Sequence, residues 1–461
     1  MQGFARRHTV AEALAWLDEQ LSPGPGGPGL PSSLPSESVP LRAASGRVLS
    51  AAIVSDVDVP GFDRATMDGY AVVAEATEGA TAYNRITFRV IGDALPGVPF
   101  AGAITGNDAV RIMTGAPVPA GSNAVLPAEF VEAPRDSGFG LSRHSGEAAP
   151  AETREPKAST LTETSAQGHV LPGDLKVSGY LGSFPGTILA TESVSPGKNI
   201  GRRGEDIVSG DELLPAGRVL RPQDVGVLSS IGHDSITVVK QPRVRLVITG
   251  NELLPAGTRP REYRITDANG PMLSALAERD GAVVHFPGLV NDEADAILEA
   301  LQADADIVIV SGGSSVGIED LAPTLVATHG NLAIHGIAMR PSSPTGLGRL
   351  GHRLIFLLPG NPVSSLCAYD FFAGRAIRAL GGRSATWPYR RVRGTLSRKI
   401  SSPIGRLDYA RVRIHEGRVE PLAVAGASLL SSTTRADGFV IVGDDSEGFP
   451  AGAEIDVWLY A

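Results

Sequence analysis

Three glycine-rich segments of the sequence each follow an apolar run that is typical of a buried strand. They are Thr249-Gly-Asn-Glu252, Ser311-Gly-Gly-Ser-Ser-Val-Gly317 and Pro359-Gly-Asn-Pro-Val-Ser364. Glycine lets the backbone approach a ligand closely, and consecutive N–H groups beside a helix start bind phosphate oxygens. Any αβ turn favours glycine, but three such segments in one sheet favour a pocket for a phosphorylated ligand. The residues that we expect to line it are Gly250, Asn251, Glu252, Gly312, Gly313, Ser314, Ser315, Gly317, Pro359, Gly360, Asn361 and Pro362.

Acidic side chains accompany these segments, namely Glu252, Asp267 and Asp320. A carboxylate beside a phosphate repels it unless a cation lies between them, and Mg²⁺ commonly binds one or two carboxylates together with phosphate oxygens. Each acid could instead cap a helix or close a turn, and Asp267 precedes a predicted helix that starts near Pro271. The residues alone leave both roles open.

Several familiar kinds of site are disfavoured. The glycine spacing matches neither the G-x-G-x-x-G of a dinucleotide-binding fold nor a P-loop with its Lys-Ser/Thr, which argues against a dehydrogenase or a P-loop ATPase. The nine histidines form no H-x-x-x-H pair, and no G-x-S-x-G occurs, which argues against a zinc site and a nucleophile elbow. Cys367, the single cysteine, lies in an apolar stretch and is predicted to be a buried structural thiol.

Three further polar motifs lie upstream of these loops. Residues 62–72 combine two acids, a hydroxyl and a turn glycine before a predicted strand, and residues 111–119 place a threonine and a glycine at a strand end. Residues 202–206 (RRGED) put two guanidinium groups beside two acids. The arginine pair could bind an anion in bidentate fashion or form a surface ion pair with Glu205 and Asp206, and the ion pair is favoured.

The charge balance argues against a nucleic-acid partner. The 461 residues include 50 acids and 41 Lys and Arg side chains, for a formal net charge of −9. No apolar run approaches the roughly 18 residues of a membrane span. Thr9-Val-Ala-Glu12 is typical of a capping box that opens an amphipathic helix, not of a signal peptide. We therefore expect a cytoplasmic protein without a membrane partner.

The order of elements predicts a multidomain protein of the α/β plus β class. Short β-branched apolar runs alternate with helical stretches over 219–380, which predicts a doubly wound parallel sheet with ligands at the carboxyl ends of its strands. Alternating runs predict a β-rich domain over 57–189 and a small β domain over 385–461. The remaining parts are an N-terminal helix packing with the α/β domain (1–21) and two parts of a linker domain (22–56 and 190–218).

The chain has 55 glycines and 34 prolines, more than average usage, and two segments absorb much of this surplus. Residues 22–40 are so rich in Pro, Gly and Ser that no regular structure is expected, only a flexible or extended linker. Residues 133–168 carry almost no large apolar side chain and are interpreted as an insertion without a packed core.

Taken in order, the motifs resemble those of the molybdopterin molybdenumtransferase family (bacterial MoeA and the gephyrin E domain). The resemblance covers nearly the whole chain outside the two segments just described. The matching stretches are PGFDRATMDGYAV (60–72), RIMTGAPVPAGSNAV (111–125), GRRGEDI (201–207), ITGNELL (248–254), TDAN (266–269), SGGSSVGIED (311–320), LLPGNPVS (357–364), GRLDYARVRI (405–414) and TTRADGFV (433–440).

The resemblance implies a fold and a reaction. The fold is a molybdopterin-binding α/β domain, a β-rich domain, a linker domain and a C-terminal small β-barrel-like domain, in a homodimer whose active site is built from both subunits. The reaction takes adenylylated molybdopterin, hydrolyses the adenylate, and inserts molybdate with the assistance of Mg²⁺, releasing AMP. The molybdopterin adenylyltransferase is then a candidate partner.

The resemblance also implies roles for individual residues. The implied catalytic residues are Asp63, Thr114, Glu205, Asp267, Asp320 and Arg340, and the implied metal ligands are Glu205, Asn251 and Asp267. Pro359 and Pro362 would shape the loop after the last parallel strand.

One segment departs from the family pattern. The family usually shows Lys-Pro-Gly-x-Pro, whereas this chain has Arg340-Pro-Ser-Ser-Pro344. Arg340 keeps the charge as a planar fork. Ser342 adds a side chain where the backbone would approach a ligand, and Ser343, also expected to contact the ligand, replaces a second cation of some members. Two alternatives therefore stay open, a non-catalytic molybdopterin-binding or scaffold paralogue and an insertase that prefers tungstate.

Overall fold

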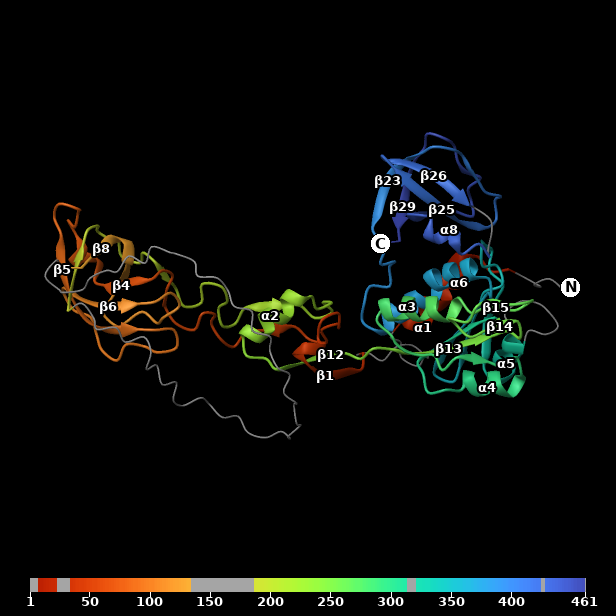
Figure 1. The fold of residues 1–461 in the computed structure, drawn as a ribbon. Coiled ribbons are helices and arrows are strands. Elements are labelled where there is room, and N and C mark those ends of the chain that lie inside the picture. Colours follow the sequence, from red (N-terminus) through yellow and green to blue (C-terminus); the bar gives the residue numbers. More distant parts are fainter. Residues whose placement is uncertain (1–6, 23–33, 134–185, 313–320, 424–427, 461) are drawn as a thin grey trace, which may run out of the picture. The chain divides into compact units, whose positions relative to one another are not determined.

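The computed structural model describes residues 7–22, 34–133, 186–312, 321–423 and 428–460. The chain forms two compact units (Figure 1). The larger unit comprises residues 1–53 and 212–461, and the smaller unit comprises residues 54–211. Each unit is described by itself.

A seven-stranded sheet forms the centre of the larger unit, in the order β16-β13-β18-β22-β21-β19 with β17 pairing β13. The three apolar runs form its parallel core, as predicted, because β13, β18 and β22 pair in parallel. All five residues of β18 are buried, which explains its unbroken apolar sequence. The antiparallel extension by β21 and β19 was not predicted. The strands are β13 (Arg243–Thr249), β16 (Val283–His285), β17 (Leu289–Val290), β18 (Ile307–Ser311), β19 (Asn331–His335), β21 (Gly346–Leu350) and β22 (Arg353–Leu358).

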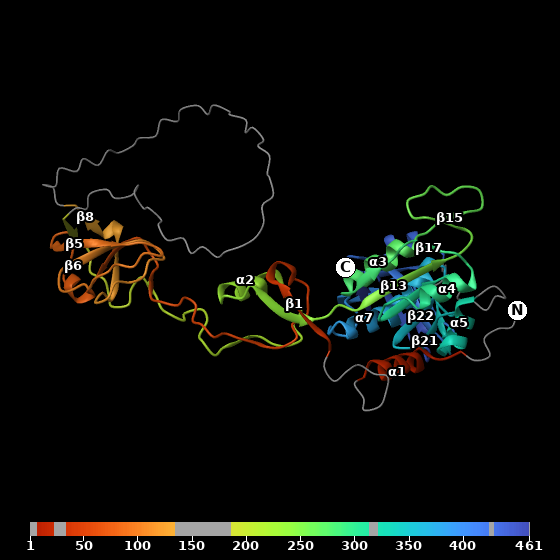
Figure 2. The same ribbon diagram turned by 90° about the horizontal axis from the view of Figure 1, so that it is seen from below.

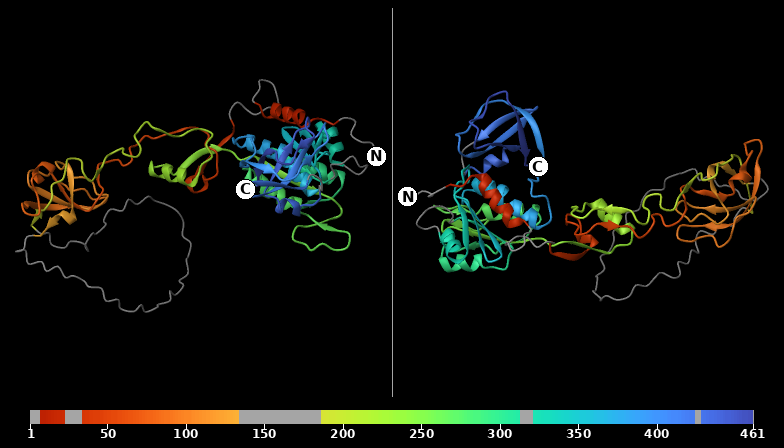
Figure 3. Two further views of the ribbon diagram at one scale, coloured as in Figure 1. Left: turned by 90° about the horizontal axis from the view of Figure 1, so that it is seen from above. Right: turned by 180° about the vertical axis from the view of Figure 1, so that it is seen from behind.

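Helices cover both faces of this sheet (Figures 1 and 3). Alternate strand residues point to opposite faces, so Ile309 packs in the core under α3 and Val308 in the core under α4. One face packs against α1 (Val10–Leu21), α3 (Asn269–Arg279), α6 (Pro362–Ala368), the π-helical segment Tyr369–Ala373 and α7 (Gly374–Leu380). The other packs against α4 (Ala294–Leu301) and α5 (Leu321–His329).

Two local predictions on this face are confirmed. Thr9 caps α1 through the predicted capping box, because its side chain accepts from the Glu12 N–H at 3.1 Å while the Glu12 carboxylate accepts from the Thr9 N–H at 2.7 Å. Cys367 in α6 is fully buried, and burial raises the pKa of its thiol far above the usual range. The thiol is therefore a packing group and not a nucleophile. No helix in the described ranges is long and apolar enough to cross a membrane.

The expectation that residues 22–40 hold no regular structure is wrong at its C-terminal end. Ser36–Pro40 forms β1, which pairs antiparallel with β12 (Ser235–Val239). Pro40 stands at the end of the strand, where a missing N–H is tolerated. The partner strand lies far along the chain, so the local composition carries no sign of it. Residues 23–33 lie outside the described residues, as does all but residue 133 of the predicted 133–168 insertion. Nearby elements are η1 (Leu41–Ala43), β11 (Glu212–Leu214) and α2 (Pro222–Ser230).

A C-terminal β-barrel completes the larger unit. Its strands follow the order β25-β26-β23-β29-β27, and β27 pairs back onto β25, so the predicted barrel is closed. β20 (Met339–Arg340) reaches from the α/β part and adds to β25 in parallel. The remaining elements are β23 (Arg391–Leu396), β24 (Ile400–Ser401), β25 (Leu407–His415), β26 (Arg418–Ala423), α8 (Ser431–Thr434), β27 (Gly438–Val442), β28 (Gly448–Phe449) and β29 (Glu454–Leu459).

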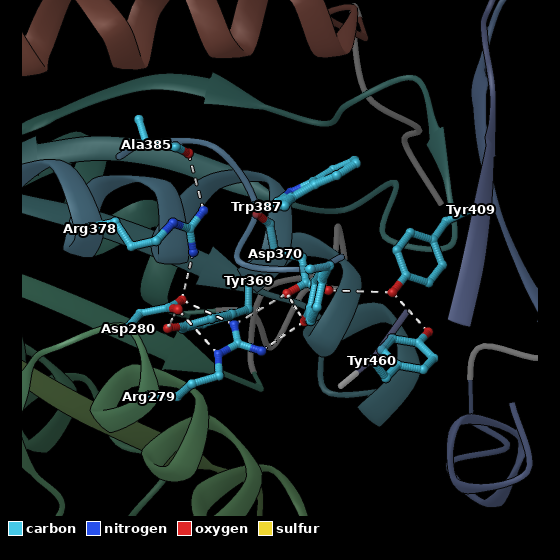
Figure 4. A network of polar contacts seen from close by, with 10 residues as sticks. Arg279, Asp280, Tyr369, Asp370, Arg378, Ala385, Trp387, Tyr409 and Tyr460 are labelled. Atoms are coloured by element: carbon cyan, nitrogen blue, oxygen red, sulfur yellow. Dashed lines mark hydrogen bonds and ion pairs between the residues drawn. The ribbon is translucent and has the colours of Figure 1, made fainter. Parts of the chain in front are cut away.

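A buried polar network joins this barrel to the helices of the α/β part (Figure 4). Asp370, in the π-helical segment, accepts hydrogen bonds from Tyr389 at 2.8 Å and from Tyr409 of β25 at 3.4 Å. Asp280, at the end of α3, accepts from Tyr369 at 3.0 Å and from Arg378 at 2.7 Å. The network therefore fixes the C-terminal end of the α/β part against the barrel.

The smaller unit is built on a six-stranded sheet in the order β7-β4-β6-β5-β9-β8, which matches the predicted β-rich texture. Phe88, Leu126 and Ile188 are fully or almost fully buried in its core. A short pair, β3 with β10, ties the 62–72 motif to the 201–207 motif. The elements are β2 (Ile53–Val54), β3 (Arg64–Ala65), β4 (Gly69–Val72), η2 (Ala74–Thr77), β5 (Ile86–Ala94), β6 (Asp108–Ile112), β7 (Ala124–Pro127), η3 (Ala128–Phe130), β8 (Val131–Glu132), β9 (Thr187–Ala190) and β10 (Ile200–Gly201).

Candidate functional site

The carboxyl ends of β13, β18 and β22 converge at one edge of the large sheet. Gly312, just after β18, has φ +100°, and a Cβ built on it would lie 2.0 Å from the Thr249 carbonyl oxygen at the end of β13. Only glycine fits there, because an added methyl group would overlap backbone that cannot move aside. A Cβ on Gly360, after β22, would lie 3.6 Å from the Gly312 Cα. The three predicted loops therefore meet backbone to backbone.

Asn269, the first residue of α3, ties this edge together. Its side-chain Nδ2 donates to the Ser311 Oγ at 2.8 Å and to the Gly360 carbonyl at 2.7 Å. Because a carbonyl only accepts, the amide must turn its NH₂ group toward Gly360, which leaves Oδ1 pointing elsewhere. Oδ1 is buried and has no hydrogen-bond partner among the described residues. Asn269 was not among the predicted site residues, although its place in the TDAN motif was a usable signal.

Asp267 lies two residues earlier, and the structure shows one of the two roles that its sequence left open, the cap of α3. Its Oδ1 accepts from the Gly270 N–H at 2.9 Å, so it caps the start of α3. Its Oδ2 is buried and, within the described ranges, has no hydrogen-bond partner. Burial raises the pKa of this carboxyl, and the backbone N–H groups of Gly270 and Asn269 only partly oppose the rise. The structure thus keeps a desolvated carboxylate oxygen available at the ends of the strands.

The other predicted loop residues differ in their exposure to solvent. Asn251 and Glu252 are exposed after β13. Thr249, which precedes them, donates to Asp292 at 2.8 Å, so its hydroxyl is already engaged. Pro359 is buried, and Pro362 begins α6 directly after the exposed Gly360 and Asn361. The predicted residues Gly313, Ser314, Ser315, Gly317 and Asp320 lie outside the described residues.

In the smaller unit the RRGED arginines form ion pairs, but not with the partners expected. Arg202 Nη1 donates to Asp63 at 2.7 Å, and Arg203 Nε donates to Asp58 at 2.6 Å. The expected pairing with Glu205 and Asp206 was wrong, because the β3–β10 pair brings the 56–65 segment alongside the arginines. The arginines of this motif therefore hold two acids of the smaller unit.

The acids of this unit are well supplied with donors. Asp63 also accepts from the Arg203 N–H at 2.8 Å, and this backbone bond, ahead of the Arg202 side chain, lowers the pKa of its carboxyl. Glu205 accepts from the Arg202 N–H at 3.1 Å. Thr114 donates to Asp68 through both its N–H, at 2.7 Å, and its hydroxyl, at 2.8 Å, which lowers the pKa of Asp68. Each implied catalytic residue of this unit is thus already engaged in hydrogen bonds, over long range for Asp63 and Thr114 and within one turn for Glu205.

No group of three or more His, Cys, Asp or Glu side chains that could hold a metal ion occurs in the described part of the chain. The larger unit offers instead the buried oxygens of Asp267 and Asn269. Oxygen donors of this kind suit Mg²⁺, which keeps several waters and is completed by substrate phosphates. The residues present therefore fit a magnesium ion that arrives with a phosphorylated ligand.

Comparison with known proteins covers almost the full length of the chain. Residues 8–232 match the MoeA N-terminal region (domain I and II), residues 245–379 a probable molybdopterin binding domain, and residues 393–460 the MoeA C-terminal region (domain IV). Molybdopterin molybdenumtransferase 2 of Mycobacterium tuberculosis is 30% identical over 433 residues, which cover 91% of this chain and 94% of that protein. This chain belongs to the molybdopterin molybdenumtransferase family.

Further members agree with this assignment. Molybdopterin molybdenumtransferase of Staphylococcus aureus is 28% identical over 437 residues, covering 93% of this chain and 92% of that protein. Two structures of the molybdopterin biosynthesis MoeA protein from Pyrococcus horikoshii resemble this one with TM-scores of 0.74 and 0.69, at 26% and 28% identity. Both cover 99% of this chain and 100% of the other. The multidomain family fold is confirmed, and relatives named as transferases do not favour a non-catalytic scaffold.

The segment that departs from the family pattern is held by contacts within the protein. Arg340 forms an ion pair with the fully buried Asp408 of β25, which Arg406 also approaches at 3.3 Å. Ser342 keeps a left-handed backbone, with φ +93°, although it replaces the family glycine. Its buried hydroxyl donates to the Ser364 carbonyl at 2.5 Å. The side chain is therefore buried and already hydrogen-bonded, which argues against the expectation that it stands in the path of a ligand.

A cavity of about 790 Å³ lies at the opposite edge of the sheet. Arg243, Asp306 and Leu354, at the amino ends of β13, β18 and β22, belong to its lining. None of the predicted site residues of this family member lines it. Ligands of doubly wound sheets bind at the carboxyl ends of the strands, where the loop backbone and the buried oxygens of Asp267 and Asn269 lie. The carboxyl edge is therefore the candidate site, although the cavity is elsewhere.

Proposed function

We propose that this chain is a molybdopterin molybdenumtransferase, which inserts molybdate into adenylylated molybdopterin and releases AMP. Family membership gives it a role in molybdenum cofactor biosynthesis. The observation that carries the specific proposal is the pair of buried oxygens of Asp267 and Asn269, which have no hydrogen-bond partner among the described residues and lie at the strand ends of the matched molybdopterin binding domain. A carboxylate and an amide oxygen kept out of water at a glycine-lined edge suit a phosphorylated ligand that brings its own cation.

The proposal includes a magnesium site. Asp267 would hold the ion, and Asn251 and Glu205 are proposed as further oxygen ligands. When bound, Mg²⁺ neutralises charge that develops on the phosphate oxygens. The chain's own part is to fix the carboxylate through the Gly270 N–H and to keep the strand-end loops in register through Asn269. We assign Asp63, Thr114, Glu205 and Asp320 to the same catalytic task, and Arg340 to supporting it from its pair with Asp408.

Three further features belong to this proposal. We propose that the enzyme is a cytoplasmic homodimer, that its active site draws on both subunits, and that it receives substrate from the molybdopterin adenylyltransferase. Light scattering of the purified chain measures the oligomeric state, and a monomer mass at micromolar concentration would contradict the homodimer. A pull-down between the two purified proteins measures the last.

The test of the activity is AMP release. The purified full chain is mixed with adenylylated molybdopterin, molybdate and Mg²⁺, and AMP is measured by chromatography. Release that needs both Mg²⁺ and molybdate supports the proposal, whereas AMP at the level of a protein-free control overturns it. Replacing molybdate with tungstate in the same assay decides which oxyanion is preferred. Rescue of an insertase-deficient strain shows that the product is active cofactor.

A further inference from the structure

A strongly basic segment projects from the larger unit beside the candidate site. Residues 255–264, here called the arm, connect β14 (Leu253–Leu254) to β15 (Ile265–Thr266). The arm therefore leaves the chain just after the predicted Gly250–Glu252 loop and returns just before Asp267. Figures 2 and 3 show it as a green loop that extends beyond β15, away from the rest of the unit.

The base of the arm is fixed by hydrogen bonds. β14 and β15 pair with each other, and the Thr266 hydroxyl donates to the Thr258 carbonyl at 2.6 Å. The Arg264 guanidinium donates back to the Leu253 carbonyl at 2.8 Å. The segment is thus anchored at both ends, and one of its three arginines is used for this purpose.

The outer part of the arm leaves cationic and aromatic groups in solvent. Arg259 and Arg261 are exposed, and their side chains form no hydrogen bond or ion pair with other described residues. Tyr263 is 99% exposed. With Arg264 and one opposing acid, Glu262, the arm carries a net charge of +2 (three arginines minus one glutamate) in a chain whose net charge is −9.

This combination matches one kind of ligand. Guanidinium groups bind phosphate oxygens in bidentate fashion, and an exposed aromatic ring stacks on a nucleobase. A chain with a net charge of −9 lacks the basic surface of a nucleic-acid binder, so a small nucleotide fits better than a polymer. The substrate of the proposed reaction carries such a group next to the pyrophosphate that the neighbouring strand ends would hold.

We infer that the arm binds the adenylate end of the substrate, with Arg259 and Arg261 on its phosphate and Tyr263 stacked on the adenine. The choice of adenylate rests on the proposed function, whereas the binding of a purine nucleotide by the arm does not. The family resemblance does not account for these residues, which lie between two of its motifs.

The inference is tested by titrating AMP and inorganic pyrophosphate into the full chain by calorimetry. Arg259→Ala/Arg261→Ala is expected to raise the Kd of both ligands by about tenfold. Tyr263→Ala is expected to raise the Kd of AMP alone by about tenfold, because pyrophosphate has no base to stack. Tyr263→Phe should restore the wild-type Kd of AMP, since the ring and not the hydroxyl makes the contact.

Matched controls come from equally exposed positions elsewhere. Tyr83, at 102% exposure, and the exposed Arg42 are changed to alanine and should leave both Kd values unchanged. Unaltered AMP affinity in both arm variants overturns the inference. If wild type binds AMP too weakly to titrate, the KM for adenylylated molybdopterin replaces Kd, and an unchanged KM overturns it equally. A chain that binds AMP through the arm but produces no AMP from adenylylated molybdopterin would contradict the proposed function and leave this inference standing.

Discussion

Asp63 in the smaller unit and Asp267 in the larger unit both belong to acidic motifs of the sequence, yet their surroundings are opposite. Asp63 receives hydrogen bonds from the Arg202 guanidinium and the Arg203 N–H, which lower the pKa of its carboxyl. Asp267 receives only backbone N–H donors, keeps one buried oxygen without a partner among the described residues, and has its pKa raised by burial. Asp63 is hydrogen-bonded within its own unit, whereas Asp267 keeps an oxygen that no described residue contacts by a hydrogen bond.

The comparison separates an acid whose oxygens are already hydrogen-bonded by arginine from an acid that keeps one buried oxygen for a proposed ligand. A buried carboxylate oxygen without a hydrogen-bond partner destabilises the folded state. Binding of a ligand or cation to that oxygen would offset this destabilisation. The motif residues alone do not reveal this difference, because both acids stand in loops directly next to short strands. The partner of each oxygen is what distinguishes them.

The largest expected effect is on Asp267. Asp267→Asn should lower AMP release by at least about 100-fold, because the amide lacks the charge needed beside a cation. The variant should be as stable as wild type, since asparagine still caps α3 and removes a desolvated charge. Melting temperature and AMP release are measured together, with Asp295→Asn, an exposed acid of α4, as the matched control. A loss of activity that tracks a loss of stability would remove Asp267 from the site.

Asp370 allows a test of whether a raised pKa alone identifies a site residue, because it is a buried carboxyl outside the candidate site. Burial raises its pKa to about 7, yet Tyr389 and Tyr409 both donate to it. A carboxyl with a raised pKa takes up a proton on folding, so its contribution to stability is present at low pH and is lost as the pH rises toward 7. Wild type should therefore gain on the order of 2 kcal/mol relative to Asp370→Asn between pH 8 and pH 5.

Chemical denaturation of both proteins at the two pH values measures this difference, in which other titrating groups cancel. AMP release by Asp370→Asn at pH 7 should stay within about threefold of wild type, because the residue joins the barrel to the helices and not the strand ends. An equal pH response in the two proteins would show that Asp370 is ionised throughout. A collapse of activity would show that burial alone predicts the site.

Asp63→Asn is expected to cost about 1 kcal/mol of the stability of the smaller unit, discounted for the 38% exposure of its side chain. A carboxyl with a lowered pKa stabilises at pH above its ordinary value of 3.8 and loses this contribution as the pH falls further. The difference in the free energy of unfolding between the variant and wild type should therefore be smaller at pH 3 than at pH 5. Chemical denaturation of both proteins at pH 5 and pH 3 measures this difference, and a difference that grows toward acid pH would contradict the comparison.

The sequence predicted the parts of this fold that leave a local pattern. The mostly apolar runs of β13, β18 and β22 predicted buried parallel strands, and the glycines after them marked where the strand-end loops meet. The pairing of Arg202 with Asp63 was missed because the two residues lie 139 positions apart. Glu205 and Asp206 are adjacent in the sequence and were therefore predicted as the partners. The orientation of Asn269 was missed for the same reason, since its Gly360 partner is 91 positions away and is a backbone atom.

The smallest expected effect is that of Ser342→Gly. This variant tests whether the 340–344 segment is held only by contacts within the protein or also takes part in the candidate site. Ser342→Gly relieves roughly 1 kcal/mol of backbone strain at φ +93° but removes a buried hydrogen bond to Ser364 of about 1 kcal/mol. The two effects offset each other, so the free energy of unfolding should change by less than about 1 kcal/mol. AMP release should not change, because the hydroxyl points into the core. A faster variant would show instead that the serine obstructs the ligand, and that the family glycine at this position belongs to the chemistry.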